Sequence, residues 1–238
     1  MKKTYFIHSI LLALFLQINI SNAQKQAVLN LPKYDVERLH FGFSLGINST
    51  DFIIHPIKDF YKFDSLKTIE SESQLGFNLG IVSDLRLNKY FNLRFIPDIS
   101  FAQRNLNYYF SGTEVFTRIK KIESTFLNFP INIKLRSERI NNAGAYMLAG
   151  GKYTLDLASQ KGIKSEIPGQ EAIKLKKHDF SYELGAGIQF YLPYFKLAIE
   201  TKLSVGIRNL LIKDNTLFSR PIDGLNSKVF LIAFMFEG

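Results

Sequence analysis

Residues 38–48 alternate between bulky apolar side chains and small or polar ones, in the sequence RLHFGFSLGIN. A period of two is that of a β-strand, because successive side chains of a strand point to opposite faces. One face carries Leu39, Phe41, Phe43, Leu45 and Ile47, and the other carries Arg38, His40, Gly42, Ser44, Gly46 and Asn48. Glycine weakens a strand unless something must approach it closely, as in a crowded barrel interior. Large apolar residues outside and small polar ones inside are typical of an outer-membrane β-barrel, whose outer wall faces lipid.

Residues 1–23 have the features of a secretory signal peptide. Lys2 and Lys3 precede an apolar stretch over residues 5–20, and the small-residue ending at Ala23 predicts cleavage before Gln24. No other segment approaches the roughly 18 apolar residues that a spanning helix needs, so a membrane-embedded mature chain must cross as strands. We expect residues 24–37 to form a periplasmic segment and residues 38–238 to form the barrel domain; a plain periplasmic domain is the alternative.

Cysteine is absent from the chain, which excludes a disulfide framework, a thiolate metal site, a cysteine nucleophile and a lipoprotein anchor. The formal net charge is +9, and loss of Lys2 and Lys3 lowers it by two to +7. The bases gather in segments that resemble loops: Arg118, Lys120, Lys121, Lys161, Lys164, Lys174, Lys176 and Lys177. An exported protein seldom meets nucleic acid, whereas an outer leaflet is rich in phosphate. We therefore expect these bases to lie in solvated loops or, alternatively, to contact lipid phosphate, with outer-membrane lipid and no nucleic acid as a partner.

Seven further segments show strand periodicity: residues 75–85, 91–101, 124–135, 143–153, 180–190, 195–207 and 228–236. The faces of residues 143–153 are indistinct because of their glycines, and Pro130, on the polar face of its strand, predicts a bulge. Long connections at 49–74, 104–123, 154–179 and 209–227 alternate with short ones near Asn88, 138–142 and Pro193. With both termini periplasmic, this alternation predicts an all-β, eight-stranded antiparallel barrel, integral to the outer membrane of a Gram-negative bacterium.

An interior of this size has room only for the barrel's own side chains, so an open pore is not expected. Six charged residues share the predicted inner faces of the strands: Arg94, Asp98, Glu183, Glu200, Lys202 and Arg208. Because an unpaired buried charge costs several kcal/mol, we expect them to form a salt-bridged network that fills the lumen. A proton or solute relay through these groups is the alternative.

Three histidines that survive signal cleavage are the candidate catalytic bases: His40, His55 and His178. His40 and Ser44 share a face, but four residues along a strand span about 13 Å, too far for a base to reach its nucleophile. His178 precedes Asp179 at the outer end of a strand, where a solvated pair is the simpler interpretation. We therefore expect no enzyme activity and no catalytic residues.

Other kinds of site are also not indicated. The pair Gly185 and Gly187 lacks the third glycine and the following helix of a dinucleotide fingerprint. No histidine or carboxylate cluster has metal-ligand spacing, and the residues identify no cofactor or small-molecule substrate. Asp35 and Glu37, beside Arg38, are expected to cap the opening of the barrel.

Polar details of several segments resemble a known family. They are HFGFSLGINSTDF at 40–52, FNLRFIPDISFAQR at 91–104, STFLNFPINIKLRSERINN at 124–142, YELGAGIQFYLPYFKLAIETKLSVGIRNLL at 182–211 and IDGLNSKVFLIAFMFEG at 222–238. In these segments the chain resembles the PorT/SprT family, the small outer-membrane barrels of the type IX secretion and gliding machinery. The indistinct strand at 143–153 is the one departure.

The resemblance implies a non-enzymatic protein required for exporting cargo with C-terminal sorting domains and for the associated gliding motility. It implies partners among other type IX secretion components and no catalytic residues. Alternatives are a generic barrel that stabilises the envelope by binding lipopolysaccharide, a barrel enzyme using His178 or Asp179, and a soluble lipocalin-like barrel. The last would place its strand glycines in solvent, where they only reduce stability.

Overall fold

The computed structural model describes residues 28–60, 66–111, 116–158, 173–214 and 216–238. The predicted signal peptide and its cleavage site lie outside these residues, as does the start of the segment 24–37. Among the described residues no helix is long and apolar enough to span a membrane.

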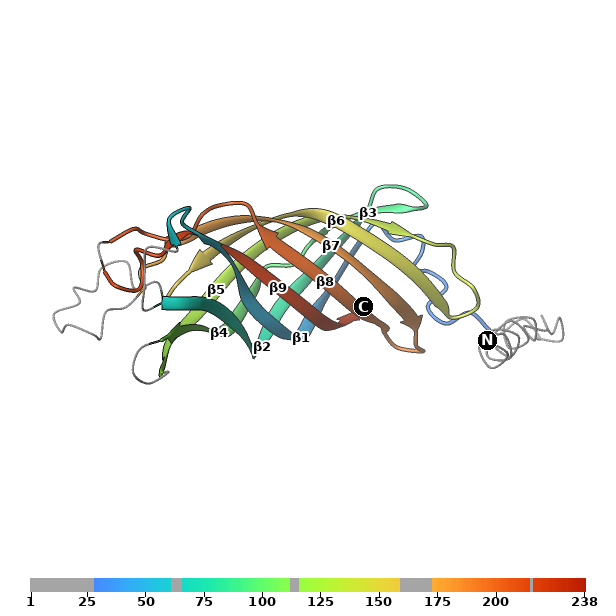
Figure 1. Ribbon diagram of the computed structural model, residues 1–238. Coiled ribbons are helices and arrows are strands. Elements are labelled where there is room, and N and C mark those ends of the chain that lie inside the picture. Colours follow the sequence, from blue (N-terminus) through green and yellow to red (C-terminus); the bar gives the residue numbers. More distant parts are fainter. Residues whose placement is uncertain (1–27, 61–65, 112–115, 159–172, 215) are drawn as a thin grey trace, which may run out of the picture.

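A single antiparallel sheet closes on itself into a barrel whose strands run obliquely to its axis (Figure 1). Its strands are β1 (Leu39–Pro56), β2 (Leu66–Arg86), β3 (Phe91–Phe95), β4 (Asp98–Phe110), β5 (Phe116–Arg136), β6 (Ala143–Asp156), β7 (His178–Tyr191), β8 (Lys196–Gly206) and β9 (Ile222–Glu237). Strand β1 pairs with both β2 and β9, which closes the ring. At this seam the rings of Phe43 and Phe236 stack at 4.8 Å.

Strands β3 and β4 are two parts of one barrel strand, so the ring has the eight strands that the sequence predicts. Phe95 pairs with Ile131 and Asp98 with Asn128, which keeps the same offset on both sides of the gap. The gap holds Pro97 and faces Pro130, and neither proline has a backbone donor for the ladder. The predicted bulge at Pro130 is therefore wrong: the register of β5 with β6 runs through it unshifted, and the ladder is interrupted instead.

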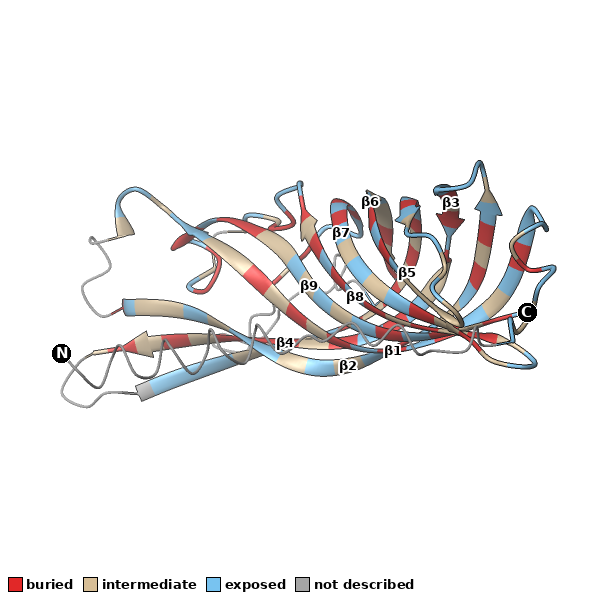
Figure 2. Ribbon diagram, turned by 90° about the vertical axis from the view of Figure 1, so that its right-hand side faces the viewer, coloured by how far each residue is buried: buried red, intermediate tan, exposed pale blue. Residues whose placement is uncertain are grey.

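Buried and exposed residues alternate along the strands (Figure 2). Large apolar side chains are exposed on the outer wall, among them Phe41, Phe43, Leu79, Ile133 and Leu184. Polar and charged side chains such as Asn48, Arg94 and Glu200 are buried inside. The structure also settles β6, in which Tyr146, Leu148 and Thr154 are buried while Met147 is exposed.

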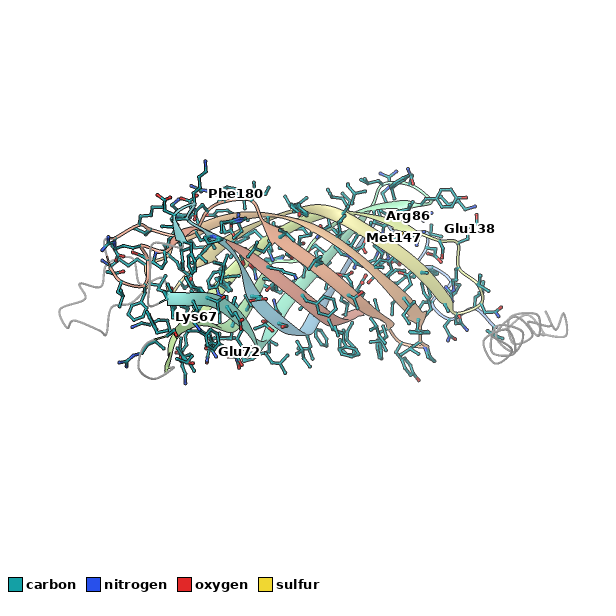
Figure 3. All side chains as sticks on the ribbon, in the orientation of Figure 1. Lys67, Glu72, Arg86, Glu138, Met147 and Phe180 are labelled. Carbon is teal, nitrogen blue, oxygen red and sulfur yellow. The ribbon has the colours of Figure 1, made fainter. Side chains whose placement is uncertain are left out.

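Two of the predicted long connections are wrong, because the strands continue far into them. Strand β1 extends to Pro56, and β2 and β5 each have 21 residues, about twice the 9–11 needed to cross a bilayer. The three short turns lie at the opposite end of the barrel, which identifies that end as periplasmic. Figure 3 accordingly places Arg86 and Glu138 near the periplasmic end and Lys67 and Glu72 toward the extracellular end.

The polarity of the two strand faces inverts in the extracellular extension. Along β4 the outward residues change from Phe101 to Gln103, while the inward ones change from Ser100 to Leu106 and Tyr108. The inward apolar residues pack with side chains from the connections into one cluster: Phe52, Leu66, Leu106, Tyr108, Phe110, Ile173, Leu175, Leu210, Leu211, Phe218, Ile222 and Leu225. The extension is thus apolar inside, as in a soluble β-protein, and the wall below it is apolar outside.

Adjacent glycines of β6 provide a test of the crowded interior. A Cβ at Gly150 would lie 2.1 Å from the Ile131 backbone oxygen, whereas a Cβ at Gly151 would have its nearest neighbour, the Ser181 oxygen, at 3.9 Å. We expect Gly150→Ala to destabilise the folded barrel by about 1–3 kcal/mol, the range for overpacking. Gly151→Ala should be neutral or slightly stabilising. Urea unfolding in lipid vesicles measures both, and equal stabilities would contradict the arrangement.

Candidate functional site

The interior of the membrane-spanning zone is occupied by charged side chains that the strand period directs inward. Arg94, on the short strand β3, is fully buried and lies at their centre. Its guanidinium forms ion pairs with Asp84 at 2.8 Å, Glu200 at 2.9 Å and Glu237 at 3.1 Å. These carboxylates come from β2, β8 and β9, so one arginine links strands from around the ring.

Two lysines and a tyrosine complete the charged layer around Arg94. Lys134 reaches Asp84 at 3.1 Å, and Lys196 reaches Glu237 at 2.7 Å. The Tyr146 hydroxyl donates to Glu200 at 2.9 Å. Three bases therefore face three carboxylates, and this balance is what makes burial of so many charges tolerable.

A second group lies on the extracellular side of this layer and centres on Glu183. Its carboxylate faces Lys152 and Lys202, each at 3.4 Å, and accepts hydrogen bonds from Asn132 and Ser204. Lys202 also approaches Glu200 at 3.8 Å, which connects the two groups.

A small space lies beyond the second group in the described part of the chain. A polar cavity of about 40 Å³ lies between it and the extracellular apolar cluster, which is room for a few water molecules. Arg104 borders this cavity, donates to Ser124 at 3.0 Å and lies over the ring of Phe52 at 4.0 Å. The described interior is therefore filled with side chains rather than open.

Five of the six residues of the predicted lumen network point into the barrel. Arg94, Glu200, Glu183 and Lys202 join in ion pairs. Asp98 is half-buried and accepts hydrogen bonds from two amides instead, Asn78 at 2.7 Å and Asn128 at 2.8 Å.

Arg208 was wrongly assigned to the lumen. Strand β8 ends at Gly206, so the alternation that would turn Arg208 inward no longer applies at its position. Its side chain is exposed, with the guanidinium carbon 5.9 Å from the ring centre of Phe180 on the outer wall.

Sequence reasoning missed five charged residues of these two ion-pair groups: Asp84, Lys134, Lys152, Lys196 and Glu237. Three of them, Asp84, Lys134 and Lys196, lie on strand faces that the alternation already marks as polar. Glu237 escaped because the last strand is apolar on both faces and the predicted strand stops one residue earlier. Extending the alternation of inward and outward residues to the end of this strand would have identified Glu237 as an inward residue.

The described part of the N-terminal segment covers the end of the barrel at which the short turns lie. Tyr34 is buried, stacks on the ring of His40 at 3.7 Å and donates its hydroxyl to Glu237 at 2.8 Å. Burial, with the neighbouring Glu237 carboxylate, raises the pKa of the Tyr34 phenol, so the hydroxyl stays protonated and remains a donor. Asp35 pairs with Arg136 at 2.7 Å, consistent with the expected capping role of this segment.

His178 and Asp179 are neighbours on β7, but their side chains point to opposite faces of the strand. His178 is exposed, with its Nδ1 2.7 Å from the Tyr153 hydroxyl, and Asp179 accepts a hydrogen bond from the Phe180 backbone. His40 is enclosed by Tyr34 at the periplasmic end. Among the described residues no three histidine or acidic side chains lie together as metal ligands would.

A closed barrel with an apolar outer wall and a charged, filled interior defines an integral outer-membrane protein. The chain belongs to the outer membrane protein beta-barrel domain family, whose sequence model matches residues 22–211. No curated protein matches the chain.

Three solved structures are similar in fold. Ail of Yersinia pestis, crystallised with the heparin analogue sucrose octasulfate, is 13% identical and has a TM-score of 0.39, covering 85% of this chain and 100% of its own. OprG of Pseudomonas aeruginosa is 12% identical, with a TM-score of 0.43 and coverage of 84% and 91%. The N-terminal β-barrel domain of OprF of Pseudomonas aeruginosa is 9% identical, with a TM-score of 0.31 and coverage of 81% and 97%. At these identities and scores the similarities add nothing about function.

Removal of Arg94 tests the charged layer. Arg94→Met leaves three buried carboxylates without their shared partner, and we expect the barrel to lose about 3–5 kcal/mol of unfolding free energy. Arg208→Met is the matched control, because it removes the same group from an exposed position and should leave stability nearly unchanged. Urea unfolding in lipid vesicles compares the two; similar losses would refute a central role for Arg94.

Release of the N-terminal segment is testable by proteolysis. Tyr34→Ala removes both the stacking on His40 and the hydrogen bond to Glu237, so trypsin should cleave the folded protein after Lys33 faster than in the wild type. Val36→Ala changes a side chain that is 77% exposed and should leave the rate unchanged. Unchanged cleavage in the Tyr34 variant would show that the segment is held by other contacts.

Proposed function

We propose that this protein is a non-enzymatic component of a type IX secretion system, required for export of cargo with C-terminal sorting domains and for the associated gliding motility. The proposal rests on the resemblance to the PorT/SprT family in the segments quoted above. In this proposal the protein acts through contacts with other components of the machinery and with outer-membrane lipid.

The filled interior is the observation that supports action through surface contacts rather than as a conduit for cargo. The ion pairs of Arg94 and Glu183 join strands across the lumen, and the remaining polar cavity measures about 40 Å³. A folded cargo protein has no path through such an interior. The surfaces available for function are therefore the lipid-facing wall, the periplasmic turns and the extracellular extension.

The proposal includes the organisation of the chain. Residues 1–23 are removed as a signal peptide, residues 24–37 lie in the periplasm and residues 38–238 form the barrel. The docking of Tyr34 and Asp35 at the periplasmic end supports this placement of the N-terminal segment.

Absence of catalysis is part of the same proposal. His178 faces a tyrosine hydroxyl, and Asp179 is engaged by a backbone amide rather than by His178. A hydrolase needs a nucleophile and a base in mutual contact, an arrangement that neither residue offers.

The second candidate is a barrel that stabilises the envelope by binding lipopolysaccharide. Exposed Lys176 and Lys177 on the extracellular side favour it, because phosphate groups attract such bases. Lys174 is less available, since it pairs with Asp214 at 3.5 Å.

Deletion of the gene in the native host distinguishes the two functions. We expect export of a sorting-domain cargo to fall to background while uptake of small hydrophilic solutes stays unchanged, because a filled barrel contributes no pore. We expect the wild-type gene and a Lys176→Glu, Lys177→Glu double variant each to restore export when introduced into the deletion strain. Normal export in the deletion strain, with loss of envelope integrity that the double variant does not repair, would contradict the proposal and favour the second candidate.

A further inference from the structure

Two adjoining concave surfaces lie where the barrel wall meets the periplasm. The first is a basic pocket of about 250 Å³ between the β2–β3 turn, the β5–β6 turn and the N-terminal segment. Four bases and two acids line it: Arg86, Lys89, Arg136, Arg139, Asp35 and Glu138. The pocket therefore carries an excess of two positive charges, which the protein's own acids leave unbalanced.

The second surface is an apolar groove of about 800 Å³ on the outer wall across β5, β6, β7 and β8. It exists because small outward side chains, Ala145 and Ala186, lie between larger ones such as Leu135, Ile188 and Ile199. Cross-strand pairing places Leu135 beside Met147, and Met147 beside Ala186, in one row.

Arg136 and Ser137 line both surfaces, so the apolar groove leads directly to the basic pocket. The apolar groove gives way to the basic pocket at the end of β5, where the lipid-facing wall ends and the periplasmic turn begins. A ligand that fits both has a long apolar tail that crosses strands β5 to β8 and a negatively charged head at the periplasmic boundary.

We propose that these surfaces together bind an anionic phospholipid of the periplasmic leaflet. An acyl chain occupies the groove between Leu135 and Ile188, and the phosphate lies in the pocket near Arg86 and Lys89. Arg86 is suited to this role because its Nε donates to the Asn88 backbone oxygen at 3.2 Å, while among the described residues its guanidinium forms no ion pair. Lys89 pairs with Glu138, and Arg136 and Arg139 pair with Asp35; all three bases contribute charge to the pocket.

Native mass spectrometry of the full-length protein in detergent tests the proposal, with phosphatidylglycerol and phosphatidylcholine of identical chains as probes. We expect a retained phosphatidylglycerol adduct at one molecule per barrel and at least a tenfold weaker phosphatidylcholine adduct. Equal retention of the two lipids, or of neither, would overturn the proposal. This comparison needs only the wild-type protein.

Variants separate the two halves of the site. Ala186→Phe fills the groove and should reduce phosphatidylglycerol binding about tenfold, whereas Ala149→Phe, an outward residue of β6 that does not line the groove, should not. The double variant Arg86→Gln, Lys89→Gln should also reduce phosphatidylglycerol binding about tenfold. Arg208→Gln is the control and should leave this binding unchanged. Inorganic phosphate at millimolar concentration should not displace the lipid. Displacement by phosphate together with normal binding by Ala186→Phe would show a free-phosphate site and overturn the assignment to a lipid.

Discussion

Arg94 and its three carboxylates are the interaction on which the rest of the structure depends. The outer wall gains stability from lipid wherever apolar side chains face outward, but the interior must neutralise every charge that the strand alternation directs inward. One guanidinium with contacts to β2, β8 and β9 does this for the centre of the barrel. Because those contacts cross the lumen, they fix the shape of the barrel and occlude it at once. Occlusion and stability therefore have the same physical origin.

The outer surface of the barrel faces lipid in one zone along its axis and water in another. In the membrane zone, polar residues are inside and apolar ones outside, whereas in the extracellular extension Phe52, Leu106 and Tyr108 pack inside and the outer face is polar. Strands β1, β2, β4 and β5 continue through this inversion, with a register shift in the β2–β4 pairing between Ser73 and Phe77, so the extension is a paired continuation of the barrel sheet. A protein that acts through contacts gains an ordered extracellular surface in this way, as well as a lipid-facing wall and a periplasmic face.

Much of the fold follows from the sequence because the period of two directly reports which side of each strand faces lipid. The eight strands, their short turns and the inward direction of Arg94, Glu183, Glu200 and Lys202 were all accessible in this way. The full length of the strands was not accessible from the sequence. Beyond Phe101 the period of two persists, but the polar and apolar faces exchange sides, and such a segment resembles a loop in the sequence. The choice of ion-pair partners was also not accessible: the sequence groups Asp84 and Lys134 only by face. The pairing of Asp84 with both Arg94 and Lys134 depends on the curvature of the closed sheet.

The central claim is that the interior is closed by its own charged side chains. Conductance of the purified full-length protein in a planar lipid bilayer tests this claim most directly. The account predicts that the current stays at the level of the protein-free bilayer across the voltages that the membrane tolerates. Reproducible, discrete conductance steps that scale with the amount of inserted protein would contradict it, because they would require a continuous water-filled path past Arg94.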